Sequence, residues 1–415
     1  MIFSRNFLPD VGEAVREGSS PDRYMKRFLR SINFRELLRP IGQVTTFSLG
    51  TIAVLSAIVL ILALILDRTV VGKTLYGQLH VTLLTYTLAN LPQVAMDGLT
   101  IGFVYAAVAL GYTMVYGVLE FINFAHSEIF AAGAFVGIEL LIGLDKHGLL
   151  AGASLFMAYT FLIVAMLIGM VAAGALAVVV ERVAYRPLRR ASRLVPLISA
   201  IGVSFFLQDA IRLIESLTTG QFNRIFPTFG NFDNRLDFGS VNMGATHIMF
   251  GLSVKSLIVI VSAVLMLMAL NYLVNATKVG TAIRAVAQDM STASLMGVDV
   301  NQVISITFLV GGALGGAAGL LFALKFTRID PFVGFFPGLK AFTAAVLGGI
   351  GNMTGALLGG IVLGMLETFA GSYMGVFTMG AAGTEYKDIF AFSILILVLI
   401  FRPRGLMGEE VGQKA

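Results

Sequence analysis

Cysteine is absent from this 415-residue chain, and charged side chains are scarce. Without cysteine, neither a disulfide framework nor a thiolate metal site can form. The four histidines stand in unrelated contexts, so we expect no metal centre. Charged residues make up 13% of the chain and hydrophobic residues 57%, and the mean hydropathy is +0.87. A chain of this composition has too few polar residues to cover its surface in water, which indicates an integral membrane protein.

Apolar segments of membrane length follow one another along the chain. A helix needs about 20 residues to cross the hydrocarbon core. The segments therefore predict an all-α, polytopic helical bundle with about nine to ten transmembrane helices, some re-entrant or broken, rather than a barrel. The predicted spans are Thr46–Leu66, Gly98–Leu119, Glu128–Leu144, Leu149–Val180, Val195–Ile214, Ser253–Val274, Val303–Leu324, Phe342–Ile350 with its flanks, Thr354–Ala370 and Ile389–Phe401. The fourth is overlong, so it is tilted, extends into water or contains a break.

The N-terminal region precedes the first apolar run and is polar and basic. That run lies too deep in the chain to be a cleavable signal, so we expect it to remain as an extra span. Residues 1–45 are interpreted as a basic, amphipathic arm, in which 23–39 form either an interfacial helix or a plain tail. Residues 46–92 contain the extra helix and an outer linker, 93–408 form the main transmembrane domain, and 409–415 are a tail.

Basic residues gather on the connectors of one side. By the positive-inside rule these connectors are cytoplasmic. The basic N-terminal arm then lies on the same side, and both termini are predicted to be cytoplasmic, which requires the even number of crossings that ten spans supply. The largest connector on the opposite side is 215–249, whose charges nearly cancel. The cytoplasmic basic residues are Arg182, Arg186, Arg189, Arg190, Arg193, Lys278, Arg284, Arg402 and Arg404.

Polar groups interrupt the apolar chain between Gly98 and Gly133, in the run Asn-Phe-Ala-His-Ser-Glu that begins at Asn123. Such groups between two spans suggest a site rather than an anchor. His126 is a hydrogen-bonding residue at a helix break, a gating or pathway group, or a catalytic group of a membrane enzyme. Glu128 and Asn123 suit the positive end of the helix that follows. We expect the junction at the cytoplasmic end of one span.

Other charged residues lie inside predicted spans. Asp209 and Arg212 stand three residues apart, and we expect them to pair because a lone charge in lipid is costly. Glu367 has no evident local partner, which makes it a candidate for lining a polar cavity. The residues predicted to line a substrate pathway are Tyr116, Asn123, His126, Glu128 and Glu367. No catalytic residue is predicted.

Glycine is abundant, with 46 residues concentrated in the apolar runs. Small residues at every fourth position let helix backbones approach closely in lipid. The pattern predicts packing faces, which also suit helices that slide or rock. Residues 348–355 are rich in glycine and predict a hairpin or re-entrant turn. The predicted helix-packing glycines are Gly311, Gly315, Gly319, Gly351, Gly355 and Gly359.

The cytoplasmic connector 278–300 contains an amphipathic helix pattern, with Ile283 and Val286 on one face and Gly297 as a helix stop. It is either an interfacial helix or a helix that docks into a motor subunit. The segment Gly72-Lys73-Thr74 ends like a phosphate-binding loop, but Asp67 occupies the position of the first required glycine. No nucleotide site is therefore predicted on this chain.

Three motifs resemble the shorter of the two inner-membrane permeases of bacterial branched-chain amino acid ABC importers. The first runs through Gly98, Tyr105, Gly111 and Tyr116-Gly117 to Asn123-Phe-Ala-His126. The second, taken as the ATPase-coupling connector, contains Arg284, Ala285, Asp289, Met296 and Gly297. The third contains Gly348-Gly-Ile-Gly351, 355–360 and 401–408. Two features depart from that family: Ser127 replaces its usual glycine, and 1–92 is not part of its shared core.

The resemblance implies that 93–408 is the permease domain of an inner-membrane importer that works by alternating access and performs no covalent chemistry. The implied partners are a second homologous permease, two cytoplasmic ATP-binding subunits that hold the only ATP, an extracytoplasmic amino-acid-binding protein and lipid, without nucleic acid. Urea or short amides are alternative substrates. An ion-coupled secondary transporter and an intramembrane enzyme that uses His126 and Glu128 are the competing hypotheses.

Overall fold

The computed structural model describes residues 34–69, 73, 81–189, 191–192, 194–243, 246–349, 351–402 and 405–408. Most of the predicted N-terminal arm, the ends of the Gly72–Thr74 segment and the predicted tail lie outside these residues. From Phe34 onward the chain is already helical: α3 spans Phe34–Asp67 and includes Pro40. The end of the predicted arm is therefore continuous with the first span.

Eight helices among the described residues are long and apolar enough to cross a membrane, which confirms the polytopic helical bundle. Two further apolar helices, α13 (Phe335–Gly348) and α15 (Lys387–Phe401), are shorter. After α3, the long helices are α5 (Leu83–Leu119), α6 (His126–Lys146), α7 (Leu155–Val180), α8 (Leu194–Thr219), α9 (Val254–Ala276), α12 (Val300–Phe326) and α14 (Met353–Phe377).

Several predicted boundaries are wrong. Helix α5 begins at Leu83 rather than Gly98, because Thr82 caps its N-terminus through the backbone N–H of Thr85 and the helix continues through Pro92. The overlong fourth span begins only at Leu155, after a turn, and α7 continues into a π-helical turn, Glu181–Tyr185, and a short 3₁₀ turn, Arg186–Leu188. Of the three explanations for its length, the structure shows a start six residues later than predicted, and the distortion of the helix lies beyond Val180.

The outer connector 215–249 is not a simple loop. Strands β2 (Arg235–Met243) and β3 (Thr246–Ser253) form an antiparallel hairpin with an irregularity between Asp237 and Gly239. The side chain of Gln93 on α5 accepts hydrogen bonds from the Arg235 side chain and the Gly251 backbone, both at 3.0 Å. A second, two-residue pair joins β1 (Arg224–Ile225) to β4 (Arg328–Ile329).

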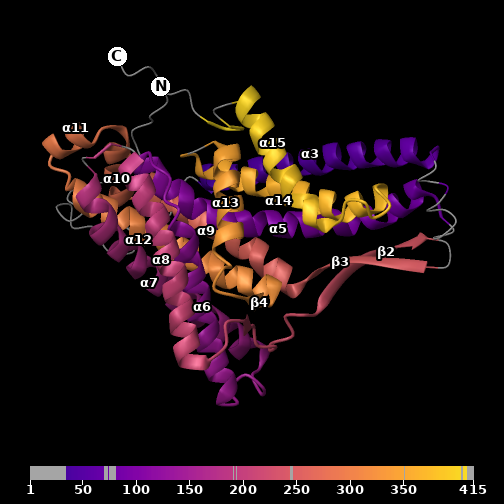
Figure 1. The fold of residues 1–415 in the computed structure, drawn as a ribbon, viewed down its shortest axis with the longest axis horizontal. Coiled ribbons are helices and arrows are strands. Elements are labelled where there is room, and N and C mark those ends of the chain that lie inside the picture. Colours follow the sequence, from indigo (N-terminus) through magenta and orange to yellow (C-terminus); the bar gives the residue numbers. More distant parts are fainter. Residues whose placement is uncertain are drawn as a thin grey trace, which may run out of the picture.

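The helices form two groups that diverge from one end of the molecule (Figure 1). Helices α3, α5 and α14 run side by side toward the β2–β3 hairpin, while α6, α7 and α8 form a second group at a steep angle to them. Helix α12 packs against α5, α6 and α7, and so joins the two groups. The connector helices α10 (Lys278–Gln288) and α11 (Met290–Leu295) lie at the end from which the groups diverge.

Candidate functional site

The chain folds back between α5 and α6 toward the centre of the bundle. Helix α5 ends at Glu120 in a left-handed conformation, with φ of 53°, and α6 begins at His126. A Cβ on Gly315 would lie 3.1 Å from Cε1 of His126, and Gly315 stands near the middle of α12. The start of α6 therefore lies beside the middle of α12, whereas Asn123 bonds to Tyr185, next to Arg186 at the end of α7. The expectation that the junction lies at the end of a span is wrong only for the start of α6, because the chain re-enters the bundle between Glu120 and His126.

Asn123 is a polar anchor of this junction. Its Oδ1 accepts hydrogen bonds from the backbone N–H of Ala125 at 3.1 Å and from the hydroxyl of Tyr185 at 2.6 Å. Tyr185 belongs to the π-helical turn after α7, a kind of distortion that often accompanies functional sites. Asn123 does not cap α6 directly, since Ala125 is the N-cap residue.

His126 is buried between α5 and α12. Its ring packs edge-on against Tyr112, with the ring centroids 4.6 Å apart, and bonds to the backbone carbonyl of Val108. Its Nε2 is buried and has no hydrogen-bond partner among the described residues. Gly111 and Gly315 leave the space that the ring occupies.

Glu128 is fully buried in the first turn of α6. One carboxylate oxygen accepts from the hydroxyls of Ser127 and Ser204, both at 3.4 Å. The other, Oε2, has no hydrogen-bond partner among the described residues. It faces Gly334, the N-cap residue of α13, where a Cβ would approach it to 2.6 Å. The N-terminal end of a helix carries partial positive charge, which suits this carboxylate.

Ser127, which replaces the expected family glycine, fits without disturbing the turn. Its hydroxyl donates to the backbone carbonyl of Phe124 at 2.7 Å. On α13, a Cβ at Gly338 would overlap the Ser127 side chain. A glycine on the facing helix therefore provides the space that the serine needs.

Tyr116 lies beside the junction and lines a small cavity between α5 and α13. The cavity has a volume of about 10 Å³, which is room for about one water molecule. The described chain thus has no passage for an amino acid at this point. Its lining residues are Tyr112, Thr113, Tyr116, Ile122, Asn123, Phe342 and Ala345.

Glu367 lies apart from the junction and is fully paired. Its carboxylate is 2.9 Å from Lys340 Nζ and 3.0 Å from Lys387 Nζ, and it accepts from the Tyr105 hydroxyl at 2.8 Å. Lys340 is also 2.8 Å from Asp388 Oδ1. Glu367 has no local partner, as the sequence indicated, but its partners on three other helices place it in an ion network and not on a polar cavity.

Lys340 is a residue that the sequence reasoning missed. It lies before the predicted span Phe342–Ile350, but it is buried inside α13. The sequence feature that could have revealed it is a lysine beside an apolar run, because a charged residue within a membrane-spanning segment often has a function. The expected pairing of Asp209 with Arg212 is also wrong: within the described residues the Arg212 guanidinium lies over the rings of Phe222 and Phe332.

The connector folds as two short helices. Ile283 and Val286 are buried, and the Arg284 side chain donates to the carbonyl of Val274 at the end of α9, while Ala285 is partly buried. Asp289 caps α11, accepting from the Ser291 N–H at 2.8 Å. Gly297 has a φ of +86°, which glycine adopts without strain. Leu295 and Met296 are 88% and 81% exposed and form an apolar tip.

Five of the six predicted packing glycines lie at close helix contacts. Gly311, Gly315 and Gly319 line the contacts of α12 with α5 and α6, and Gly355 and Gly359 pack against α13. Gly351 does not pack: it lies in the turn between α13 and α14, with a φ of +89° and no atom within 4 Å of a Cβ. The turn confirms the predicted break in this glycine-rich segment, although only α13 before it is short and α14 after it has 25 residues.

Comparison with known proteins identifies the family to which these features belong. Residues 94–399 match the family described as branched-chain amino acid transport system, permease component. The chain belongs to this permease family. It is 39% identical over 327 residues to the high-affinity branched-chain amino acid transport permease BraD of Pseudomonas aeruginosa, covering 78% of this chain and 97% of BraD.

Two LivH permeases extend the comparison. The high-affinity branched-chain amino acid transport permease LivH of Escherichia coli K12 is 38% identical over 328 residues, covering 78% of this chain and 97% of that relative. A probable branched-chain amino acid permease LivH of Methanocaldococcus jannaschii is 28% identical over 308 residues, covering 73% and 88%. This chain is therefore a multi-pass membrane permease component, and α3 precedes the matched region.

Proposed function

We propose that this chain is the transmembrane permease subunit of an ATP-driven importer of branched-chain amino acids. The observation that carries the proposal is the identity of 38–39% with two high-affinity branched-chain amino acid permeases across nearly their whole length. Urea and short amides are the alternative substrates within the same kind of importer. The apolar lining expected for leucine also fits these small molecules, so uptake must decide.

The proposed complex contains a second homologous permease, two ATP-binding subunits and an extracytoplasmic amino-acid-binding protein. ATP is bound by the partner subunits. The apolar tip Leu295–Met296, presented by two capped helices at one end of the bundle, supports docking of the connector into a groove of an ATP-binding subunit. The β2–β3 hairpin at the far side of the bundle is a candidate surface for the binding protein.

The proposed orientation follows from charge. Arg284 lies on α10, and Arg182 and Arg186 lie in the helical turns after α7 on the same side of the molecule, which favours a cytoplasmic location for this end under the positive-inside rule. If the eight long and two short apolar helices of the described residues each cross the inner membrane once, the ten crossings leave both termini in the cytoplasm.

The proposed pathway passes the α5–α6 junction. Two helices begin there at mid-membrane depth, α6 at His126 and α13 beside Gly334, and transporters commonly bind substrate where helices are broken at the bilayer centre. Glu128 presents a carboxylate oxygen without a hydrogen-bond donor among the described residues, a complement to the ammonium group of an amino acid. The small cavity beside Tyr116 corresponds to a closed path, which opens as the glycine-lined helices rock in alternating access.

Reconstitution tests the function. The chain is expressed with its partner subunits, purified, and inserted into proteoliposomes that contain ATP and receive radiolabelled leucine with the binding protein. We expect ATP-dependent leucine uptake that valine inhibits and urea does not. Inhibition by urea alone would assign the amide substrate, uptake driven by an ion gradient without ATP would indicate a secondary transporter, and chemical conversion of the substrate would indicate an enzyme.

The connector is tested separately. The double variant Leu295→Ala/Met296→Ala removes the exposed apolar tip, and we expect the ATP-binding subunits to be lost during purification. Leu217→Ala, which truncates another exposed leucine at the end of α8, is the matched control and should leave the complex intact. If the ATP-binding subunits still co-purify with the double variant, the connector is not the docking element.

A further inference from the structure

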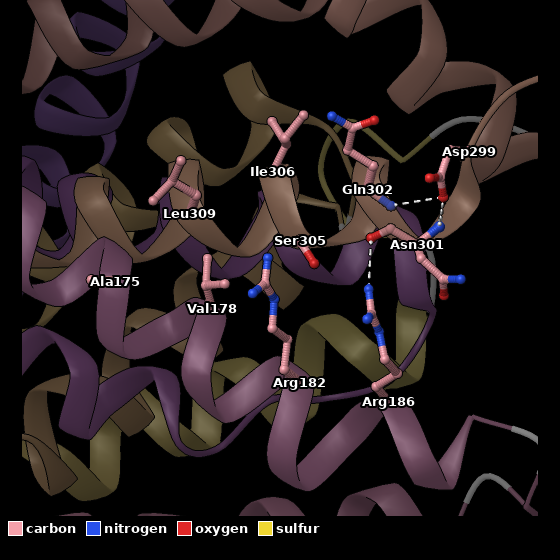
Figure 2. Close-up of a pocket in the computed structure, with 10 residues that line it drawn as sticks. All are labelled: Ala175, Val178, Arg182, Arg186, Asp299, Asn301, Gln302, Ser305, Ile306 and Leu309. Atoms are coloured by element: carbon pink, nitrogen blue, oxygen red, sulfur yellow. Dashed lines mark hydrogen bonds between the residues drawn. The ribbon is translucent and has the colours of Figure 1, made fainter.

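A groove of about 720 Å³ runs between the end of α7 and the start of α12, on the side of the molecule that carries α10 and α11. Figure 2 shows that Arg182 and Arg186 both extend from the α7 side toward α12. Helices α10 and α11 and the α5–α6 junction contribute no lining residue, and Asp299 is the one residue of the connector 278–300 in the lining. Its lining residues are Ala175, Val178, Arg182, Arg186, Asp299, Asn301, Gln302, Ser305, Ile306 and Leu309.

The groove is polar at one end and apolar at the other. Arg182, Arg186 and the first turn of α12 line the polar end. Ala175, Val178 and Leu309 line the apolar end. The path from Ala175 to Arg186 is about 16 Å at 1.5 Å per residue. That is about half of a hydrocarbon core of roughly 30 Å, so the groove has the depth of one leaflet.

The acidic residues of this region are already bonded. Asp299 accepts from the backbone N–H groups of Asn301 and Gln302, at 3.0 and 3.1 Å, as the cap of α12. The neighbouring Glu181 carboxylate is buried, is bonded by Arg189, and accepts from the Ser305 hydroxyl at 2.7 Å. Glu181 is thus shared between Arg189 and, at 3.6 Å, Arg186, while Asp299 makes no ion pair with either arginine of the groove among the described residues.

The two arginines of the groove differ in their pairing. Arg186 lies 3.6 Å from Glu181 and donates weakly to the carbonyl of Asn301 at 3.5 Å. Arg182 makes no ion pair or hydrogen bond with any part of the chain that the structure describes. It is exposed at the mouth of the groove, beside Val179 and Val183, whose exposed fractions are 55% and 73%. The unpaired guanidinium attracts an anionic group, and the exposed apolar surface beside it favours a ligand that also has an apolar portion.

We propose that this groove binds an anionic glycerophospholipid, with its phosphate at Arg182 and Arg186 and an acyl chain along Ala175, Val178 and Leu309. Charge complementarity selects an anionic headgroup, and the length and apolar depth of the groove select a lipid tail rather than a free anion. The bound lipid joins α7 to α12, the helix that connects the two groups of the bundle.

Lipid titration in neutral bilayers tests the site. The full chain is reconstituted in phosphatidylcholine nanodiscs, and binding of fluorescent phosphatidylglycerol is measured by energy transfer to a label on the protein. We expect saturable binding that excess glycerol phosphate does not displace. Displacement by glycerol phosphate would mean that the groove recognises a free anion, and absence of saturable binding would overturn the proposal.

Variants then locate the binding. Arg182→Gln removes a side chain without partners in the described chain, so folding is preserved. The double variant Arg182→Gln/Arg186→Gln is expected to weaken binding about 30-fold, since each cation near the surface contributes about 1 kcal/mol. Arg328→Gln makes the same charge change at the other end of α12, where Arg328 is exposed, and should bind as the wild type does. Wild-type affinity in Arg182→Gln would overturn the proposal.

A third variant tests the tail, and the assembled complex tests access. Ala175→Phe fills the apolar part without changing charge, and should weaken phosphatidylglycerol binding. Unchanged affinity in this variant would contradict a lipid occupant. Binding must also persist when the partner subunits are present, because its loss on assembly would mean that a subunit covers the groove.

Discussion

The α5–α6 junction and the Glu367 network both bury polar groups in the bundle, but only the network is internally paired. Glu367, Lys340, Lys387 and Asp388 balance two negative with two positive charges across α13, α14 and α15. At the junction, Nε2 of His126, Oε2 of Glu128 and Nδ2 of Asn123 are buried without hydrogen-bond partners among the described residues.

The difference separates a structural role from a transport role. A buried network whose charges are all in ion pairs holds helices together, whereas buried polar atoms with neither an ion pair nor a hydrogen bond cost free energy and persist where a function uses them. Mutations in the network are therefore expected to lower the stability of the protein. Mutations at the junction are expected to lower the rate of leucine uptake.

The largest effect on stability is expected at Lys340. Lys340→Met removes the buried cation that Glu367 and Asp388 share, which leaves the buried Glu367 with only the partly exposed Lys387 as a cation, and we expect a loss of about 3–5 kcal/mol in the free energy of unfolding. Lys387→Met is the matched control, because the Lys387 side chain is 39% exposed and its pairing is screened, so its loss should be below about 1 kcal/mol. Thermal unfolding in detergent measures both. Equal losses in the two variants would refute a structural role for the buried lysine.

A double variant tests whether Lys340 and Glu367 are energetically coupled. Lys340→Met/Glu367→Gln removes both charges of the closest buried pair, and should be more stable than Lys340→Met alone because one uncompensated charge has disappeared. A double variant less stable than either single variant would indicate that the pair is not coupled.

An intermediate effect is expected at Gly315, where the junction meets α12. Gly315→Val places a branched side chain against the His126 ring, and overpacking should cost about 1–3 kcal/mol. Gly202→Val is the control, since no atom lies within 4 Å of a Cβ at Gly202. The same unfolding assay applies. Equal stability of Gly315→Val and wild type would mean that the His126 ring is not confined there.

A smaller effect is expected at Gly351. Gly351→Ala adds a side chain at a φ of +89°, which should cost about 1–2 kcal/mol by backbone strain alone. Gly143→Ala makes the same change inside α6 with open space around it, and should be neutral or stabilising. If both alanines behave alike, the turn between α13 and α14 does not require the left-handed conformation.

The sequence predicted the bundle, the glycine contacts and the amphipathic connector, because each depends on local periodicity. Hydropathy reports burial in lipid, and a residue at every fourth position marks one helix face. Helix α13 shows the limit of this reasoning. Its apolar run is short, and its true start at Phe335 depends on contacts of Gly334 and Gly338 with α6.

The site was predicted less completely than the fold. Asn123, His126 and Glu128 stood out as polar residues in an apolar context, but their depth could not be predicted, because the burial of His126 depends on the space left by Gly111 and Gly315 on other helices. The partners of Glu367 were missed for the same reason: Tyr105 is 262 residues away in the chain.

The most direct test of the junction is ATP-driven leucine uptake by the Glu128→Gln complex in proteoliposomes. The variant loses no ion pair, so its stability should change by less than about 1 kcal/mol. Its uptake should fall at least about tenfold, which corresponds to about 1.4 kcal/mol. Glu385→Gln, an exposed residue near the start of α15, should transport normally. Wild-type leucine uptake by a correctly assembled Glu128→Gln complex would contradict a pathway through the α5–α6 junction.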